Sequence, residues 1–317
     1  MNVVISSIVP GGAGIRVFEL RACDAGPLPA YAAGAHIDVS LPNGLTRQYS
    51  LCCREPSGNT YRIAVKREPQ SRGGSDWLHA QAQAGSVLQI SHPRNAFALT
   101  ANAGMHLLLA GGIGITPILS MAYELLRRGQ PFRLLYFVRD DSSIAFAEEL
   151  TASPLAPQVR IFSGLSPQQS AAAIASTLDA DAQLAADVQV YTCGPGAFMN
   201  SVVELAQARF GVASVHKESF SLTPPGPSTA AFVLRLIRSE RDIAVAADQT
   251  ALACLQAAGI EIDCSCEVGV CGTCRTVVTD GIAQHHDAYL SPAEKLANNC
   301  FMPCVSRAAT AVLSIDL

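Results

Sequence analysis

CEVGVCGTC, residues 266–274, is the most informative stretch of this sequence. It places Cys266, Cys271 and Cys274 in the spacing C-x4-C-x2-C, and Cys304 follows after 29 intervening residues. This spacing is typical of a plant-type [2Fe–2S] cluster, in which four thiolates hold two irons that share two sulfides. A zinc site favours two separated C-x2-C pairs and a Rieske centre needs Cys-x-His, whereas the sequence has one C-x2-C and no Cys-x-His. We therefore expect these four cysteines to bind a [2Fe–2S] cluster.

The other cysteines bear on the compartment and on the fourth ligand. The chain has 11 cysteines, and its first residues show neither a basic segment nor a long apolar run. An unexported chain rich in cysteine indicates a reducing compartment, so we expect a cytoplasmic protein. For the cysteines outside the motifs we expect small, buried side chains. Cys264 and Cys300 lie close to the expected ligands, and the nearness of Cys300 to Cys304 leaves the identity of the fourth ligand open.

Charge and hydropathy argue against two classes of protein. The formal net charge is −4, which argues against a nucleic-acid binder with a basic face. Residues 230–317 carry 6 basic and 10 acidic residues, so the negative charge of this last part indicates an acidic docking surface. The longest uncharged apolar run, 107–123, is interrupted by glycines and a proline, which suits a strand, a turn and a helix better than a membrane span.

Three segments differ in pattern and predict a multidomain protein. Residues 1–102 contain short alternating apolar runs, typical of an antiparallel β-barrel, with one helix expected at 75–84. Residues 103–222 alternate strands with helices, which predicts a doubly wound α/β fold with a parallel sheet. Residues 223–229 are a linker rich in proline and glycine, and 230–317 predict an α+β domain around the cysteine loop. The strands expected in the first two segments are 15–20, 36–41, 46–52, 61–65, 87–91, 105–110, 132–139, 159–163 and 187–192.

The run LLLAGGIGITP, which ends at Pro117, predicts a nucleotide-binding turn. A strand ends at Gly111, Gly112 and Gly114, and a helix begins near Thr116, so the backbone can approach a pyrophosphate and offer it free N–H groups. The usual dinucleotide fingerprint has a third glycine where Pro117 stands, so this is not the ordinary Rossmann motif.

A second turn, Cys193-Gly194-Pro195, follows another apolar strand. The carboxyl ends of parallel strands lie at one edge of the sheet, so we expect this turn to face the same crevice as the glycine turn.

Two further motifs suit a flavin. Arg47, Tyr49 and Ser50 belong to RQYS on an expected strand, where the arginine would bind a phosphate, the tyrosine would contact the ring or ribityl chain, and the serine would bond a ring nitrogen. Gly74 and Ser75 belong to RGGS, which opens a helix and is a second phosphate site.

Together, RQYS, RGGS, AGGIGITP, CGP and the cysteine motif resemble the phthalate dioxygenase reductase family, which includes vanillate demethylase reductases. The resemblance extends over essentially the whole chain and implies a flavin domain, an NADH domain and a ferredoxin domain, in that order. It implies FMN, NADH and a [2Fe–2S] cluster, with FMN favoured over FAD because the ferredoxin domain is C-terminal. Phe220 matches the aromatic residue near the flavin ring, although a core aromatic remains an equal reading. The positions that resemble cofactor contacts are Arg47, Tyr49, Ser50, Ala64, Val65, Lys66, Gly74, Ser75, Gly111, Gly112, Gly114, Thr116, Pro117, Cys193, Gly194, Pro195 and Phe220.

The resemblance also implies a reaction. NADH delivers two electrons as a hydride, whereas a [2Fe–2S] cluster accepts one electron, so a flavin belongs between them. We expect electron transfer to a separate, terminal Rieske-type oxygenase acting on an aromatic acid or aryl ether, with this chain a monomer. No catalytic side chain is expected beyond the cofactor-contacting Ser50, Cys193 and Phe220. The alternatives are an oxygenase for a quaternary ammonium substrate, or a redox-sensing module without turnover.

One segment departs from the family pattern. The family often has His-Arg-Asp after the cluster loop, and this chain has His285, His286 and Asp287. A surface arginine for partner contact is therefore absent, and we expect His285 to be a solvated loop residue.

Coenzyme choice depends on the end of the second parallel strand, where Arg139, Asp140 and Asp141 stand. Acidic residues there accept the ribose 2′-hydroxyl and repel a 2′-phosphate, whereas an arginine attracts it. The two acids predict NADH. A second reading is that Asp140 and Asp141 cap a helix near 143–150.

Overall fold

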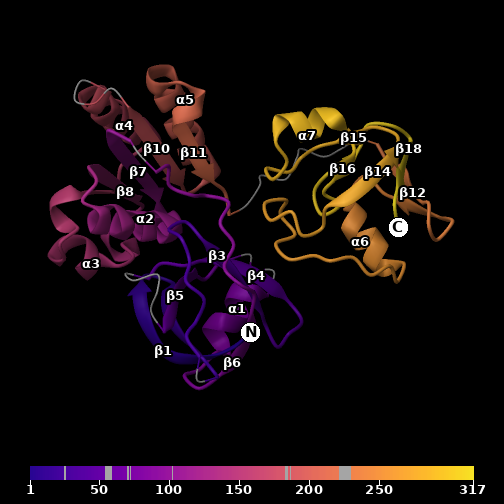
Figure 1. Ribbon diagram of the computed structural model, residues 1–317, viewed down its shortest axis with the longest axis horizontal. Coiled ribbons are helices and arrows are strands. Elements are labelled where there is room, and N and C mark those ends of the chain that lie inside the picture. The colour runs from indigo at the N-terminus through magenta and orange to yellow at the C-terminus, as the bar shows by residue number, and fades with distance from the viewer. Residues whose placement is uncertain are drawn as a thin grey trace. The chain divides into compact units, whose positions relative to one another are not determined.

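The computed structural model describes residues 1–24, 26–53, 59–69, 71, 73–101, 103–182, 185, 187–220 and 230–317, with only the backbone of residue 292 (Figure 1). The chain divides into two compact units, Met1–Glu218 and Ser219–Leu317. The expected linker, 223–229, lies outside the described residues. No helix of the described part is both long and apolar enough to cross a membrane.

The first unit begins with the predicted antiparallel β-barrel, whose strands follow the order β4-β3-β6-β1-β2-β5. Alternation places Ile37 and Val39 in the core, with Asp38 between them on the other face. The sequence analysis missed β1, because a register shift between Ile5 and Ser7 interrupts its alternation. The elements are β1 (Asn2–Gly12), β2 (Ile15–Ala22), β3 (His36–Ser40), β4 (Thr46–Ser50), β5 (Thr60–Lys66), α1 (Gly74–Ala80) and β6 (Val87–Ile90).

The barrel helix is shorter than expected. It ends at Ala80 rather than at residue 84, because the chain turns before β6. In that turn the amide of Gln83 donates to the hydroxyl of Ser86 at 3.1 Å, and Gly85 takes a φ of 92°.

The second part of this unit is the predicted doubly wound fold, a parallel sheet of order β11-β10-β7-β8-β9. Leu108 and Ala110 of β7 pack with α2, while Leu107 and Leu109 pack with α4 and α5 on the other face (Figure 1). The elements are β7 (Met105–Gly111), η1 (Gly112–Gly114), α2 (Ile115–Arg128), β8 (Phe132–Val138), η2 (Asp141–Ser143), α3 (Ala147–Ala152), η3 (Ala156–Gln158), β9 (Val159–Ser163), α4 (Pro167–Ala182), β10 (Val188–Cys193), α5 (Gly196–Phe210), η4 (Val212–Ser214) and β11 (Val215–Glu218).

A half-buried polar contact joins the barrel to the parallel sheet. The Arg62 guanidinium of β5 forms a two-pronged ion pair with Glu149 of α3, at 2.7 and 3.0 Å, and lies over the ring of Phe146. The amide of Gly34 also donates to the hydroxyl of Ser120 on α2, at 3.0 Å. These contacts explain why both parts belong to one compact unit.

The second unit contains the α+β domain, with a mixed sheet of order β13-β12-β18-β14-β16. Leu234 and Phe301 lie at its core, which α6 covers with Leu255. The elements are β12 (Phe232–Leu236), β13 (Arg241–Val245), α6 (Ala251–Ala257), β14 (Thr276–Asp280), β15 (Ala283–Gln284), α7 (Pro292–Ala297), β16 (Cys300–Phe301), β17 (Arg307–Ala308) and β18 (Val312–Ile315).

Candidate functional site

The four expected cluster ligands lie together and form two close pairs. The sulfur atoms of Cys274 and Cys304 are 3.3 Å apart. The thiol of Cys266 hydrogen-bonds to Cys271, which lowers the pKa of Cys271. Backbone amides of Val268 and Thr273 donate to the sulfurs of Cys266 and Cys271, both at 3.4 Å. Such amides stabilise negative charge on thiolate sulfur.

This arrangement fits two irons rather than one ion. Among the described residues, no three His, Cys, Asp or Glu side chains converge on one ion position. In a [2Fe–2S] cluster each iron takes two thiolates and two bridging sulfides, which two pairs of thiols supply. The remaining candidates lie outside the pairs: Cys300 is buried against Arg275, and Cys264 bonds to Gln256 at 3.5 Å. The geometry therefore favours Cys304 as the fourth ligand.

One expectation near the cluster is wrong. His285 is not solvated: its side chain is 9% exposed, and its Nδ1 lies 3.6 Å from the buried carboxylate of Asp287. The segment is drawn inward because the Asp287 carboxylate also accepts from the amide of Leu290 and the hydroxyl of Ser306.

The nucleotide turns meet at the carboxyl ends of β7 and β10, where the order of the sheet reverses; this is the position at which doubly wound folds bind nucleotides. A Cβ on Gly114 would lie 2.3 Å from the carbonyl oxygen of Cys193, so only glycine permits this approach. A Cβ on Gly194 would lie 2.9 Å from the Cα of Gly111. The buried Thr116 hydroxyl donates to the carbonyl of Ile113 at 3.1 Å and so stabilises the turn. Gly112 precedes Gly114 in η1, Pro117 lies in the first turn of α2, and Pro195 contacts Gly111.

The RQYS strand presents an orphaned polar atom. The Ser50 hydroxyl is buried and has no hydrogen-bond partner among the described residues. A flavin ring nitrogen or carbonyl would satisfy it, which fits the expected cofactor. Arg47 packs its chain on Gly74, where a Cβ would lie 2.6 Å from the arginine Cγ. Ser75 stands beside them and bonds to the hydroxyl of Ser71 at 3.0 Å.

Four other flavin candidates lie on this strand or on β5. Burial raises the pKa of Tyr49, so its hydroxyl stays protonated. Ala64 and Val65 are buried on β5, and the carbonyl of Val65 bonds to His79 Nε2 at 2.9 Å. Lys66 is half-buried and pairs with Glu68 at 3.2 Å. Phe220 is 40% exposed and falls in the second unit. Residue 72 of RGGS lies outside the described residues.

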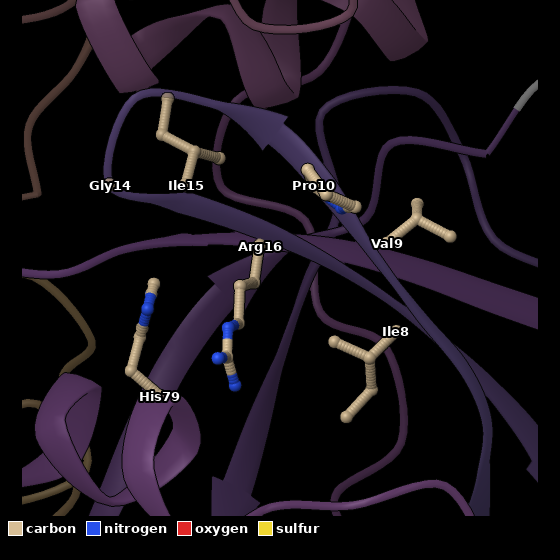
Figure 2. Close-up of a pocket in the computed structure, with 7 residues that line it drawn as sticks. All are labelled: Ile8, Val9, Pro10, Gly14, Ile15, Arg16 and His79. Carbon is tan, nitrogen blue, oxygen red and sulfur yellow. The ribbon is translucent and has the colours of Figure 1, made fainter.

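A pocket of about 460 Å³ lies between the β1–β2 hairpin and α1 (Figure 2), and two of its lining residues, Ile15 and Arg16, pair with Lys66 and Val65 of β5. None of the expected cofactor residues lines it. Its lining is mostly apolar and consists of Ile8, Val9, Pro10, Gly14, Ile15, Arg16 and His79.

The sequence analysis missed Glu218. Its position at the end of β11 pairs it with Cys193 of β10. Burial raises the pKa of Glu218 to about 8, and its Oε2 has no hydrogen-bond partner in the described part of the chain. The Nδ1 of His36 lies 4.0 Å from the Oε1 of Glu218, and His36 of β3 pairs with Ser50 of β4 in the sheet. The fold thus brings together four residues from four strands: His36, Ser50, Cys193 and Glu218. The only sequence signal for Glu218 was its position shortly before Phe220.

We expect Glu218 to lower stability as the pH rises. Its folded pKa of about 8 exceeds the usual 4.5, so the folded state holds a proton that the unfolded state releases between these values. The stability contribution is complete below about pH 4.5 and is lost towards pH 8. In Glu218→Gln the unfolding free energy should fall less over this pH range, by on the order of a few kcal/mol. Urea titrations at several pH values, followed by Trp77, the single tryptophan and in the same unit, measure it. Parallel pH profiles of the two proteins would contradict the burial argument.

The acids at the end of β8 have different roles. The Asp140 carboxylate accepts from the amide of Ser143 at 3.0 Å and from the hydroxyls of Ser142 and Ser143, which lower its pKa. Asp140 therefore caps η2, in line with the capping interpretation. The expected helix at 143–150 begins only at Ala147, because η2 and the left-handed φ of 57° at Phe146 precede it. Asp141 is exposed beside them.

This arrangement makes Asp141 the better candidate for coenzyme choice. We expect kcat/KM with NADH to exceed kcat/KM with NADPH, both measured with ferricyanide as acceptor. Asp141→Asn should reduce the ratio of these two values, because it removes the repulsion of a 2′-phosphate. Asp141→Glu, which keeps the charge, is the matched control. Equal values for both coenzymes in the wild type would show that Arg139 dominates.

A flavin-type barrel, two nucleotide turns that meet at the switch point of a parallel sheet, and paired thiols in one chain define an NADH-dependent flavin iron–sulfur oxidoreductase. Family models for an oxidoreductase NAD-binding domain and a 2Fe-2S iron-sulfur cluster binding domain match residues 108–204 and 234–309. Over the full length of both, the chain is 41% identical to vanillate O-demethylase oxidoreductase of a Pseudomonas species. Carnitine monooxygenase reductase subunit of Acinetobacter baumannii is 34% identical, over 96% of this chain and 93% of that protein. The solved structure of phthalate dioxygenase reductase matches with a TM-score of 0.79 and 37% identity, over 100% of this chain and 98% of that one. The chain belongs to the family of phthalate dioxygenase reductase and vanillate O-demethylase oxidoreductase, and its cofactors are FMN, a [2Fe–2S] cluster and NADH.

Proposed function

We propose that this chain supplies electrons from NADH to a separate Rieske-type oxygenase that acts on an aromatic acid or an aryl ether. The observation that carries the proposal is the double pair of thiols, a one-electron site, in a chain whose glycine turns also meet at the expected site of a two-electron donor. The relatives named for vanillate O-demethylation and for phthalate dioxygenation support the substrate class.

Separate groups of residues would bind the flavin and the nicotinamide. FMN, when bound, supplies the conversion of an electron pair into single electrons. Arg47 and Ser75 would hold its phosphate, and Ser50 would bond its ring. The turn at Cys193, with Gly194 and Pro195, would seat the nicotinamide against that ring.

Glu218 would act beside Cys193 as a neutral acid. Its pKa of about 8 keeps it protonated at pH 7, so it can donate a hydrogen bond beside Cys193 without placing a negative charge there. Cys266, Cys271, Cys274 and Cys304 would hold the cluster as two pairs.

A second candidate keeps the chemistry and changes the partner. The carnitine monooxygenase reductase subunit is also a relative, and carnitine is a quaternary ammonium compound. An oxygenase for a quaternary ammonium substrate is therefore the alternative partner.

The test is oxidation of NADH by this chain in the presence of purified oxygenase components. Those of vanillate O-demethylase, phthalate dioxygenase and carnitine monooxygenase form a suitable panel. We expect the fastest reduction with an aromatic-acid oxygenase. Reduction of the carnitine enzyme alone would select the second candidate, and no NADH oxidation even with ferricyanide would indicate a redox-sensing module.

Domain boundaries, assembly and compartment complete the proposal. We assign residues 1–102 to FMN, 103–222 to NADH and 230–317 to the cluster, with 223–229 as linker. We also expect a monomer in the cytoplasm, where a reducing environment keeps the 11 thiols reduced, the four cluster ligands among them.

A further inference from the structure

Tyr289 lies directly on the cluster-binding loop. A Cβ on Gly272, between Cys271 and Thr273, would fall 2.2 Å from the tyrosine Cζ, so the ring occupies the space that a side chain would take. The amide of Ala288 donates to the carbonyl of Gly269 at 3.0 Å, which joins the two segments by their backbones. Tyr289 is nevertheless 43% exposed. It therefore presents an aromatic surface next to a cluster ligand.

A buried carboxylate holds this tyrosine in place. The Asp287 side chain accepts from the amide of Leu290 at 2.8 Å and from the hydroxyl of Ser306 at 3.2 Å. Lys295 of α7 donates to the Asp287 carbonyl at 2.5 Å, and its Nζ lies 3.8 Å from the carboxylate. These bonds fix the backbone on both sides of Tyr289, so the ring is preorganised for contact.

The same contacts bring a second apolar side chain to the cluster domain's surface. Leu296 follows Lys295 on α7 and is 88% exposed, more than any other large hydrophobic residue of the described chain. Arg275, next to Cys274, lies 3.7 Å from Glu294, so α7 is also tied to the end of the cluster loop. Exposed aromatic and aliphatic residues beside a functional centre are typical of binding hot spots.

The charge around the loop is negative. Each Lys or Arg of residues 230–317 is already engaged: Arg235 with Asp242, Arg238 with Asp316, Arg241 with the carbonyl of Ala258, Arg275 with Glu294, Lys295 with Asp287, and Arg307 with three carbonyls. Glu261 and Asp263 are exposed in the segment leading to Cys266, and neither forms an ion pair with another described residue. A complementary partner surface is therefore basic.

We propose that Tyr289, together with Leu296 of the following helix α7, is the contact through which the oxygenase docks onto the cluster domain, and that the docking face of the oxygenase has a basic rim. This rests on the proposed function. Each encounter transfers one electron and no atom, so that the oxygenase is reduced and this chain is oxidised. The ring lies on the loop between the cluster ligands Cys271 and Cys274, so a protein docked there contacts the segment that would hold the cluster.

The test measures binding of the full-length holoprotein to the oxygenase component of vanillate O-demethylase by surface plasmon resonance, at low and high salt. Tyr289→Ala should raise Kd by about tenfold or more, as expected for a hot-spot aromatic, and Tyr289→Phe should restore binding. Leu296→Ser should weaken it less. Ile282→Ala, which truncates another exposed apolar residue of the same domain, should leave Kd unchanged. Salt should weaken the wild-type complex.

The readouts separate the possible failures. The visible and EPR spectra of the cluster should be unaltered in each variant. If Tyr289→Ala disturbs these spectra, the Kd of Leu296→Ser becomes the test of the docking contact. Stopped-flow reduction of the cluster by NADH should stay at the wild-type rate. Slower reduction would place Tyr289 on the flavin side and overturn the proposal, as would equal Kd values for wild type and both variants. If the wild type binds and reduces none of the oxygenase panel, the proposed function itself fails, and the docking surface with it.

Discussion

Cys271→Ser should remove the [2Fe–2S] cluster and leave the flavin in place. Cys271 forms one of the two thiol pairs, and its sulfur also accepts from the amide of Thr273. A serine hydroxyl is a poorer iron ligand than a thiolate, so one iron would lose half of its protein ligands. Iron content should fall from about two per chain to near zero. Reduction of cytochrome c with NADH should drop to background, whereas ferricyanide, which the flavin reduces directly, should still be turned over.

Two neighbouring cysteines provide matched controls for this result. Cys264→Ser and Cys300→Ser change thiols that lie near the cluster in sequence but outside both pairs, and both variants should keep their iron and their EPR signal. A normal reduced-cluster signal in Cys271→Ser would contradict the assignment. Loss of iron in Cys300→Ser, with iron retained in Cys304→Ser, would identify Cys300 rather than Cys304 as the fourth ligand.

Arg47→Ala should loosen FMN strongly. The arginine is held against Gly74 beside Ser75, so its guanidinium is preorganised at the expected phosphate position. Loss of a charge-assisted phosphate contact costs about 1.5–3 kcal/mol, or roughly a ten- to hundredfold rise in the FMN Kd. Flavin fluorescence during dilution of the holoprotein measures it.

The control for Arg47 is another arginine of the same domain. Arg67 is exposed and paired with Asp76 at 3.0 Å, so Arg67→Ala should alter the FMN affinity little. Arg47→Lys keeps the charge but loses the paired N–H donors of the guanidinium, so its FMN Kd should lie between those of the wild type and Arg47→Ala. An FMN affinity unchanged in Arg47→Ala would show that the phosphate is bound elsewhere, and stoichiometric FAD released by acid would overturn the choice of flavin.

The fold class followed from sequence because its signals are local. Both faces of β7 are buried in a parallel sheet, so the strand reads as a continuous apolar run that ends in glycines. Local patterns failed where the chain deviates from regularity: the register shift in β1 interrupted its alternation, and the turn at Gly85 shortened α1.

The sequence by itself determined the class of chemistry, because C-x4-C-x2-C and the glycine turn are spacings within single loops. Tertiary structure alone decided which distant groups meet. Cys304 joins Cys274, Glu218 lies opposite Cys193, and Tyr289 covers Gly272. It also decided the protonation of Glu218 and the burial of His285, because both depend on what other strands and loops place around these residues. Periodicity along the chain carries no record of these contacts, since they join residues far apart in sequence through the packing of the whole domain.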